Sequence, residues 1–337
     1  MCMIAGYIGP NGASEILLEM TRKQEGIFGG FSTGIVTVDA GNLRRARVVG
    51  SAQTFDEEIC KADIPGNIGI AHSRTNDGGG IEWAHPRLDS DSCLASVGVG
   101  IGGCFPSREL LLRLADQLVR DDQQFSTRTI DGRKNGILLP DGSTVHGGEI
   151  FLHALARRYQ VCASLISAVR DLNVRSETIG MYVSSAEPDR IYIVNHNQRL
   201  LISKKGQETF LATSRRALPK DFDWEFQISM NTFAVVSASS VHLEQLWQDE
   251  PKFYFDTLPG TKERVQSFIE KEQSVTYWDI VSKALDPMFP TDSATRISIL
   301  GHELIEQLLA EGAIHAETKQ VTGLDGQRVP QLVFHAR

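Results

Sequence analysis

The sequence has no long hydrophobic run. Nowhere do apolar residues approach the roughly 18 in succession that a membrane-spanning helix needs. The first residues also lack the basic start and apolar centre of a secretory signal. Both absences predict a cytoplasmic protein with no membrane partner.

Cysteine is scarce, with five residues in 337 and no CxxC pair. An odd number of scattered cysteines is typical of a reducing compartment, not of a disulfide framework. The histidines near the motifs described below do not have the spacing of metal ligands. We therefore expect these histidines to be hydrogen-bonded structural residues, and we expect no metal and no cofactor. These histidines are His72, His85, His146 and His153.

Clusters of basic residues are absent as well. The formal net charge is −8 and the pI is near 5.6, which argues against nucleic acid as the main partner. A hydrophobic content of 41% and a charged content of 23% are typical of a globular protein with a substantial core. The length of 337 residues predicts one large domain and a small one.

The most informative residue is Cys2. Removal of Met1, which a small second residue permits, would leave a thiol and a free amine on Cys2. An α-amine has a pKa of about 7.7–8.0, so near neutral pH it can accept the thiol proton. The apolar run 3–8 before the turn at 9–12 predicts a buried strand that fixes this nucleophile. The alternative is that Met-Cys has no functional meaning, because one residue carries little specificity.

A second candidate site follows the alternating strand 67–74. The strand ends at Arg74, and three glycines follow at 78–80. An arginine can hold both oxygens of a carboxylate, and nearby glycines let the backbone approach a ligand. The alternative is an arginine paired with a neighbouring acid. The strand 94–103 also runs into glycines, which form either a ligand-facing turn or an ordinary one.

The order of the predicted elements indicates an α+β fold. The first part reads strand, helix 13–24 and two strands, followed by helix 107–120 and an irregular segment 121–143. A helical pattern over 147–169 then precedes a series of short strands up to residue 247. Runs of strands beside blocks of helix favour a layered α+β sandwich over a parallel sheet.

The C-terminal part is predicted to be a separate small module. We place a large domain at 1–247, a linker at 248–273 and the module at 274–337. Two helical patterns followed by a hairpin in the module predict a winged-helix-like unit. It has five Lys and Arg against eight Asp and Glu, a net charge of −3, so packing or protein contact is favoured over DNA binding.

In order and spacing, several motifs together resemble the class II glutamine amidotransferase domain, an N-terminal nucleophile domain. They are Cys2-x-Ile4-Ala5-Gly6-Tyr7-Ile8, Gly34-Ile35, Gly69-Ile70-Ala71-His72-Ser73-Arg74, Ala84-His85-Pro86 and Gly100-Ile101. The resemblance covers about residues 2–247. It implies a four-layer αββα sandwich. It also implies that the N-terminal cysteine attacks the side-chain amide of glutamine, releases ammonia and leaves a thioester for water to hydrolyse.

The resemblance also assigns roles to residues other than Cys2. Arg74 matches the arginine that holds the substrate carboxylate, and Gly100 matches the glycine of the oxyanion hole. The family also has an acidic residue that holds the ammonium group of the substrate, and Asp77 or Glu149 can replace it. We therefore include the residues after Arg74 and the later Glu149 in the substrate site. The family has an asparagine that donates a hydrogen bond in the oxyanion hole, which this sequence lacks. Asn76 can replace that donor if the loop that contains Asn76 folds inward. The added substrate residues are Thr75, Asn76, Asp77 and Glu149.

Two departures from the family pattern bear on activity. Met3 stands where the family has a glycine, which predicts a crowded site. Val99 stands where the family has an asparagine, and the loss of one oxyanion donor costs about 10²–10³ in rate. The ammonium-binding position falls on Gly147, beside Glu149.

Three hypotheses follow from the sequence. The first is a stand-alone amidotransferase-like hydrolase of glutamine, or a related γ-glutamyl amide, that supplies ammonia to a separate synthase subunit. The second is an N-terminal nucleophile amidohydrolase for a different carboxylate-bearing amide, and the third is an inactive ligand-binding or regulatory relative. The sequence leaves open the acceptor of the ammonia and whether the chain forms a homo-oligomer.

Overall fold

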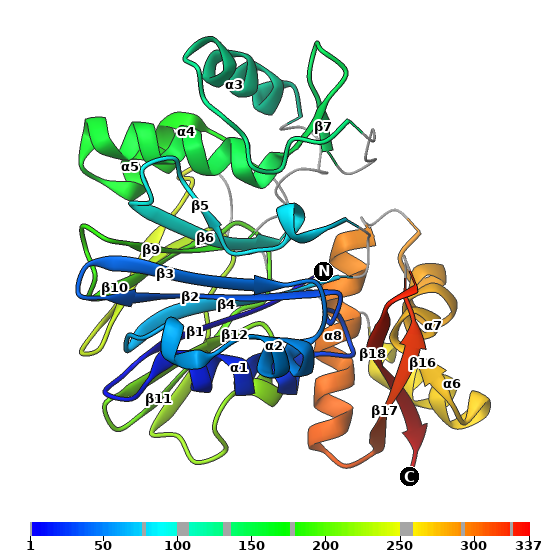
Figure 1. Ribbon diagram of the computed structural model, residues 1–337. Helices are drawn as coiled ribbons and strands as arrows, with labels where there is room; N and C mark the ends of the chain where they lie inside the picture. Colours follow the sequence, from blue (N-terminus) through cyan, green and yellow to red (C-terminus); the bar gives the residue numbers. More distant parts are fainter. Residues whose placement is uncertain are drawn as a thin grey trace.

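The protein consists of two stacked β-sheets covered by helices on both outer sides, with a smaller module packed at one end of the sheets (Figure 1). The computed structural model describes residues 2–75, 79–99, 108–130, 136–175, 179–249, 259–290, 294–323 and 326–337. None of the helices in these ranges has both the length and the apolar character needed to cross a membrane.

The first sheet has seven antiparallel strands in the order β13-β11-β12-β1-β4-β2-β3. Strand β1 lies at its centre, where Met3 pairs with Ser73 of β4 and Ala5 pairs with Ala212 of β12. The strands are β1 (Met3–Ile8), β2 (Ser32–Asp39), β3 (Asn42–Val48), β4 (Ile68–Arg74), β11 (Leu201–Lys205), β12 (Glu208–Ala212) and β13 (Trp224–Gln227).

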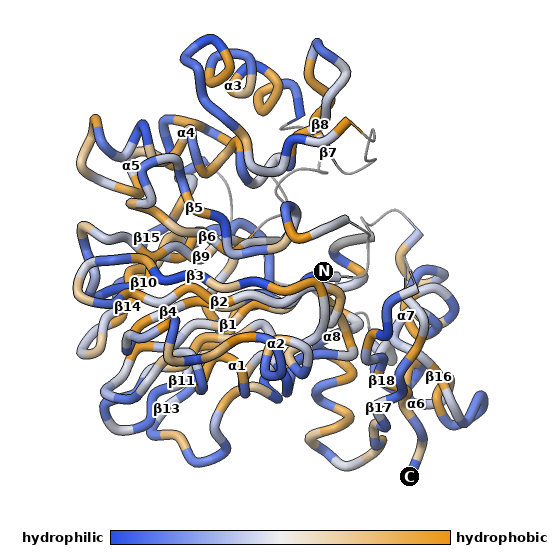
Figure 2. Tube along the Cα trace, in the orientation of Figure 1, coloured by the Kyte–Doolittle hydropathy of each residue, from blue (hydrophilic) through white to orange (hydrophobic). Residues whose placement is uncertain are grey.

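The second sheet has six antiparallel strands in the order β15-β14-β10-β9-β6-β5. They are β5 (Arg87–Leu88), β6 (Leu94–Val99), β9 (Ile179–Ser184), β10 (Arg190–Asn195), β14 (Thr232–Ser237) and β15 (Val241–Gln245). Ile4 and Ile8 of β1 face this sheet, and Ala5 and Tyr7 face the outer helix, because side chains alternate along a strand. The apolar interior between the sheets appears as orange strands in Figure 2.

Helices form the two outer layers. On the first sheet lie α1 (Ala13–Gln24) and α2 (Ala52–Glu58), and on the second lie α4 (Gly147–Cys162) and α5 (Leu165–Leu172), with α3 (Arg108–Arg120) outside α4. The structure therefore has the four αββα layers that the family resemblance implies. Short 3-10 turns are η1 (Lys61–Asp63), η2 (Ile81–Trp83) and η3 (Arg215–Ala217).

One local prediction for this domain was wrong. The segment 121–143 is not wholly irregular, because β7 (Gly136–Leu138) pairs with β8 (Thr144–His146) as a small hairpin. The helical pattern 147–169 is confirmed, but it forms two helices. Ala163 adopts a left-handed conformation (φ 52°) that ends α4, and the Ser164 side chain then caps α5.

In the described residues, the C-terminal module contains three α-helices, a π-helix, a 3-10 turn and a three-stranded sheet of order β16-β18-β17. The predicted linker 248–273 is corrected, because residues 261–272 form a helix whose Val265 and Ile269 are fully buried. The elements are α6 (Thr261–Glu272), β16 (Val275–Thr276), α7 (Tyr277–Asp279), the π-helix η4 (Ile280–Leu285), η5 (Asp286–Met288), α8 (Ala294–Ala310), β17 (Ile314–Thr322) and β18 (Arg328–Ala336).

The module shares its hydrophobic core with the start of the chain. Met3, Ile27 and Phe28 belong to the same buried cluster as the apolar residues of α6, α8 and β18. Gly26, at φ +104°, accepts a hydrogen bond from Leu332 N at 2.8 Å, so a loop of the large domain is tied to β18. A side chain at Gly26 would lie 2.8 Å from Leu332, which is why glycine is needed at this contact.

A buried carboxylate on α8 completes the contact between module and large domain. Glu306 accepts hydrogen bonds from the Arg199 guanidinium, the Ser214 hydroxyl and Arg215 N, the last at 3.0 Å. Its Oε1 also lies 3.3 Å from His302 Nε2. Burial alone would raise the pKa of Glu306, but His302, Arg199 and Ser214 together hold it below its usual range.

We expect Glu306→Ala to lower the free energy of unfolding by about 3–5 kcal/mol, because it leaves the Arg199 charge buried without its partner. Urea unfolding followed by fluorescence measures this loss. The control is Lys262→Ala, which removes an ion pair to Glu311 with side chains 34% and 52% exposed and should change stability by less than about 1 kcal/mol. Equal losses for the two variants would contradict the role given to Glu306.

Candidate active site

The thiol of Cys2 lies at the end of β1, at the junction of the two sheets and the C-terminal module. The side chain is half-buried and packs against the core between the sheets. Thr75 N and Thr75 Oγ1 each lie 3.5 Å from Cys2 Sγ, so both of these donors contact the sulfur. Because Met3 pairs with Ser73, the next position in register places Cys2 beside Arg74.

Arg74 is the last residue of β4 and is only 4% exposed. Its guanidinium carbon lies 5.7 Å from the ring centre of Trp83 and 6.0 Å from that of Phe31. Aromatic faces attract a cation at this range, so the two rings fix the position of the guanidinium. Trp83 is not among the site residues predicted from the sequence. Its position directly before Ala84-His85-Pro86 is a signal that could have identified it.

Three more arginines hold the segment 83–86 in place beneath Arg74. Arg47 Nη1 donates to Ala84 O at 2.8 Å, Arg87 Nη2 donates to Trp83 O at 3.2 Å, and Arg45 Nη1 donates to Pro86 O at 3.4 Å. Burial lowers the pKa of Arg87 to about 9 and that of Arg45 to about 10. The guanidinium groups still carry positive charge at neutral pH, which favours an anionic ligand in this region.

His72, His85 and His146, near the site, are neutral structural groups. His72 stacks on His85 with ring centres 4.3 Å apart, and its Nε2 lies 3.2 Å from Gly98 O. Burial, reinforced by the charge of Arg74, lowers the pKa of His72 to about 3, and burial also lowers the pKa values of His85 and His146. His146 Nδ1 accepts from Gly148 N at 3.0 Å and caps α4. Within the described ranges, no group of three His, Cys, Asp or Glu residues could hold a metal ion.

Glu149 lies in the first turn of α4 and is 1% exposed. Its Oε1 accepts from Ser126 N at 2.7 Å and Ser126 Oγ at 2.6 Å. Its Oε2 accepts from Thr127 N at 3.0 Å and Thr127 Oγ1 at 2.5 Å. Burial would raise the pKa of Glu149, but these bonds, His153 and the Arg87 charge lower it to about 2. The carboxylate therefore holds the 126–127 turn on α4, and its assignment to a substrate ammonium group stays a prediction.

The structure brings together Cys2, Arg74 and Thr75 of the predicted site. Gly100, Asn76 and Asp77 lie outside the described residues. Met3 is buried, and its side chain packs into the cluster of the C-terminal module on the face of β1 opposite to Cys2. Met3 therefore anchors the module, which is a different role from the crowding that the sequence suggested.

Residues of the C-terminal module reach the neighbourhood of the thiol. A cavity of about 10 Å³, enough for about one water molecule, is lined by Cys2, Phe28, Arg199 and His302 among others. A second cavity of about 210 Å³ lies between Thr75 and the module. These module residues could not be predicted from the sequence, because no local pattern links them to motifs about 200–300 residues earlier.

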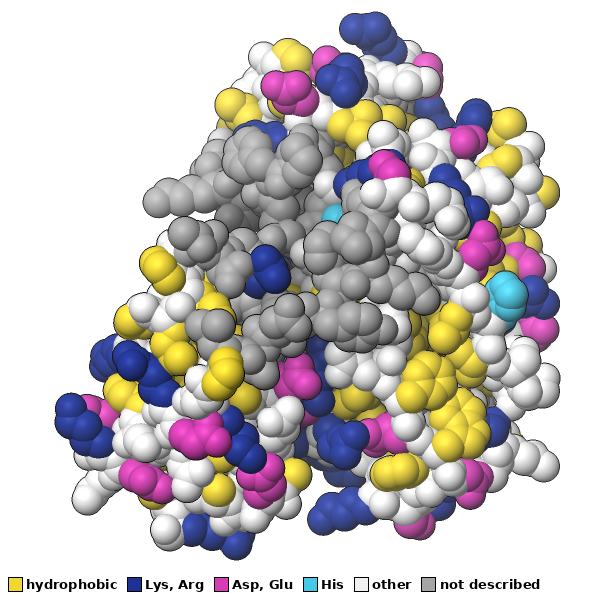
Figure 3. All heavy atoms as spheres, turned by 180° about the vertical axis from the view of Figure 1, so that it is seen from behind, with side chains coloured by type: hydrophobic (Ala, Val, Ile, Leu, Met, Phe, Trp, Pro, Cys, Tyr) yellow, Lys and Arg dark blue, Asp and Glu magenta, His cyan; other side chains and the backbone are white. Residues whose placement is uncertain are grey.

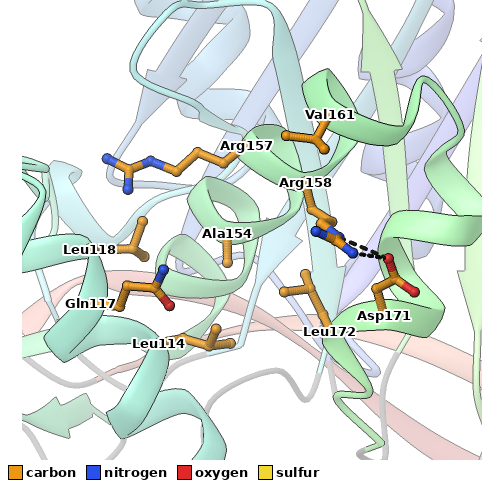
Figure 4. A pocket seen from close by; sticks show the side chains of 9 residues that line it. All are labelled: Leu114, Gln117, Leu118, Ala154, Arg157, Arg158, Val161, Asp171 and Leu172. Atoms are coloured by element: carbon orange, nitrogen blue, oxygen red, sulfur yellow. Dashed lines mark hydrogen bonds and ion pairs between the residues drawn. The ribbon is translucent and has the colours of Figure 1, made fainter.

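A larger cavity of about 360 Å³ lies apart from this chemistry, within the helical layer formed by α3, α4 and α5 (Figure 4). Leucines line one side of it. Arg158 is held there by Asp171, which accepts from Nε at 2.8 Å and from Nη2 at 2.5 Å. No cysteine, serine or threonine is among the described residues that line this cavity, and its Asp171 is paired with Arg158, so we place the candidate site at Cys2.

Behind the site, Glu25 supports the end of β4. Its Oε1 accepts from Ser73 Oγ at 2.7 Å and from Ala52 N at 2.9 Å, and Ser73 Oγ in turn accepts from Gly30 N at 2.7 Å. Burial raises the pKa of Glu25 to about 7, and the hydrogen bonds only partly oppose this rise. The carboxyl group therefore titrates near neutral pH, in contact with the residue that precedes Arg74.

Comparison with known proteins identifies the relatives of the chain. No family model matches it. Glutamine–fructose-6-phosphate aminotransferase (isomerizing) from Thermosynechococcus vestitus is 37% identical over 226 residues, which cover 65% of this chain and 32% of that protein. The enzyme of the same name from Pseudomonas aeruginosa is 28% identical over 251 residues, 72% of this chain and 36% of that enzyme. The chain thus spans about a third of the length of these relatives.

Two solved structures share the fold. The allosteric regulatory enzyme of purine biosynthesis has a TM-score of 0.59 at 15% identity, covering 81% of this chain and 58% of that one. Glutamine phosphoribosylpyrophosphate amidotransferase from B. subtilis has a TM-score of 0.57 at 13% identity, covering 94% and 66%. With the sequence relatives, these likenesses confirm the resemblance to the class II glutamine amidotransferase domain.

We predict that Glu25 makes stability depend on pH between about 4.5 and 7. In this window the folded protein keeps a proton that the unfolded chain has lost, so the free energy of unfolding falls as pH rises. Glu25→Gln removes this dependence. From about pH 5 to pH 8, the free energy of unfolding should decrease in the wild type by about 2 kcal/mol more than in the variant. Urea titrations at both pH values measure the difference, and equal falls would contradict the prediction.

Proposed function

We propose that the protein is a class II amidotransferase-like hydrolase that acts in the cytoplasm on the side-chain amide of glutamine or a related γ-glutamyl amide. The observation that carries the proposal is the contact of the Cys2 thiol with Thr75, directly after Arg74, in a chain similar to glutamine–fructose-6-phosphate aminotransferases. A nucleophile and a carboxylate clamp on neighbouring strands suit a substrate with a carboxylate at one end and an amide at the other.

The reaction begins once Met1 has been removed. The Cys2 amine accepts the thiol proton, and the thiolate attacks the amide carbon, forming a carbon–sulfur bond. The carbon–nitrogen bond then breaks, and nitrogen leaves as ammonia with the transferred proton. Water hydrolyses the thioester and restores the thiol. Gly100 N–H is assigned to the oxyanion, while Arg74 holds the carboxylate.

We place the acceptor of the ammonia on a separate chain. For the C-terminal module we propose a winged-helix-like fold. Support comes from the element order helix, strand, two helices and two strands, and from a sheet in which β18 lies between β16 and β17. Lys and Arg side chains are interspersed with Asp and Glu on the face in Figure 3, which suits a protein contact better than nucleic acid.

A second candidate is hydrolysis of a carboxylate-bearing amide other than glutamine itself. The observation that favours it is Glu149, which already accepts four hydrogen bonds from Ser126 and Thr127 and is buried. A substrate that needs no carboxylate partner from Glu149 for its amine would fit this arrangement. Glutamine would then be one substrate among several.

We expect 6-diazo-5-oxo-norleucine, a glutamine-like label, to add once to the purified untagged protein. Intact mass and peptide mapping should show loss of Met1 and a single adduct on Cys2. The exposed Cys60 and Cys93 are internal controls, because iodoacetamide should alkylate them while the glutamine analogue should not. Cys2→Ala should remove both the adduct and hydrolysis. Retained Met1 with no adduct would overturn the proposed function.

We further expect Arg74→Lys to raise KM for the carboxylate substrate by roughly 100-fold. The lysine ammonium is a point charge, whereas the arginine guanidinium makes a bidentate contact with both carboxylate oxygens. Steady-state hydrolysis measures the change, and thermal unfolding checks that the variant is folded. Arg74→Gln, which removes the charge altogether, should raise KM further. A fall in kcat with no change in KM would contradict the clamp role.

A further inference from the structure

The cavity beside Thr75 is built jointly by the large domain and the C-terminal module. It measures about 210 Å³. The large domain contributes the loop 26–29 and Thr75, and the module contributes Tyr277, Trp278 and residues 329–331 of β18. Since Thr75 also contacts Cys2 Sγ, the cavity lies one residue away from the nucleophile.

Three aromatic rings give this cavity a fixed apolar wall. Phe28 meets Tyr277 at 4.6 Å and Trp278 at 5.9 Å, and Tyr277 meets Trp278 at 5.2 Å, all edge to face. Tyr277 is buried, with its hydroxyl 2.8 Å from Ser298 Oγ. Trp278 is 49% exposed, so part of its indole remains available to a ligand. A preformed wall of this kind is typical of small-molecule sites.

The two sides of the thiol differ in character. On one side, Cys2 and Arg74 occupy adjacent registered positions, so their side chains share a face of the sheet toward Trp83. On the other side, Thr75 borders the aromatic cavity. An amide carbon attacked at Cys2 carries an acyl chain and a nitrogen. If Arg74 holds the acyl end through its carboxylate, the nitrogen is directed toward the cavity.

We infer that the cavity binds the amine side of the substrate, and that this substrate is a γ-glutamyl amide whose nitrogen bears an apolar or aromatic group. The inference rests on the proposed function. Ammonia is about the size of a water molecule, which needs a cavity of only about 10–15 Å³. Ammonia would therefore leave most of the 210 Å³ cavity empty. Apolar lining favours a ring or a branched alkyl group over a charged one.

The chemistry stays balanced with a larger leaving group. The Cys2 thiolate forms a carbon–sulfur bond with the γ-carbonyl, the carbon–nitrogen bond breaks, and the amine departs with the proton taken from the thiol. Water then cleaves the thioester to give glutamate and free thiol. Trp278 contacts the apolar group carried by the departing amine, which glutamine lacks, and acts as a specificity residue.

The test compares hydrolysis of three amides by the full chain: L-glutamine, γ-glutamyl methylamide and γ-glutamyl benzylamide. Methylamine and benzylamine are both alkylamines, so a difference between them reports mainly on contacts of the ring. We expect kcat/KM for the benzylamide to exceed that for the methylamide by about tenfold or more. Trp278→Ala should remove this preference and leave kcat/KM for glutamine within about twofold.

The matched control is Trp224→Ala, which removes a tryptophan of comparable exposure, 39%, from the edge strand β13. It should keep the preference for the benzylamide. Hydrolysis of glutamine without a preference for the benzylamide, or an equal effect of Trp278→Ala on all three amides, would overturn the inference and leave the proposed function standing. No hydrolysis of any amide, with Cys2 unlabelled by the glutamine analogue, would overturn both.

Discussion

The structure depends on one buried carboxylate, that of Glu306. It accepts from a guanidinium, a hydroxyl and a backbone amide of the large domain and lies beside His302 of its own helix. Removing these polar groups from water is favourable only when each has a partner, so the contact specifies a single orientation of α8. That orientation brings His302 to the small cavity at Cys2 and the aromatic wall to Thr75.

Different groups of residues position the thiol and set the charge around it. The strand register sets Cys2 beside Arg74, and the arginines at 45, 47 and 87 hold the carbonyls of the segment that positions Trp83. His72, His85 and His146 are neutral, so the positive charge beside them comes from guanidinium groups and changes little across physiological pH. Glu25, on the opposite side of β4, titrates near neutrality.

Much of the fold could be predicted from local patterns. The strand 3–8 and the helix 13–24 agree with the structure residue for residue, because periodicity and flanking turns define both. The split at Ala163 could not be predicted, since it depends on one left-handed residue in a helical pattern. Helix α6 was missed because its charged sequence shows only a narrow apolar face. For the candidate site, the motifs predicted Cys2 and Arg74, which the strand register brings side by side. The role of Glu149 and the approach of Trp278 depend on contacts between distant segments, which no local pattern encodes.

The shared core of Met3, Phe28 and the C-terminal module has a consequence for protein synthesis. Cys2 is synthesised before α8 and β18, which complete its surroundings and follow it by more than 290 residues. At the usual rates of translation the delay is on the order of tens of seconds. During that time the nascent chain carries the Cys2 thiol next to exposed apolar surface. Completion of the module is therefore the step at which folding and the assembly of the site coincide.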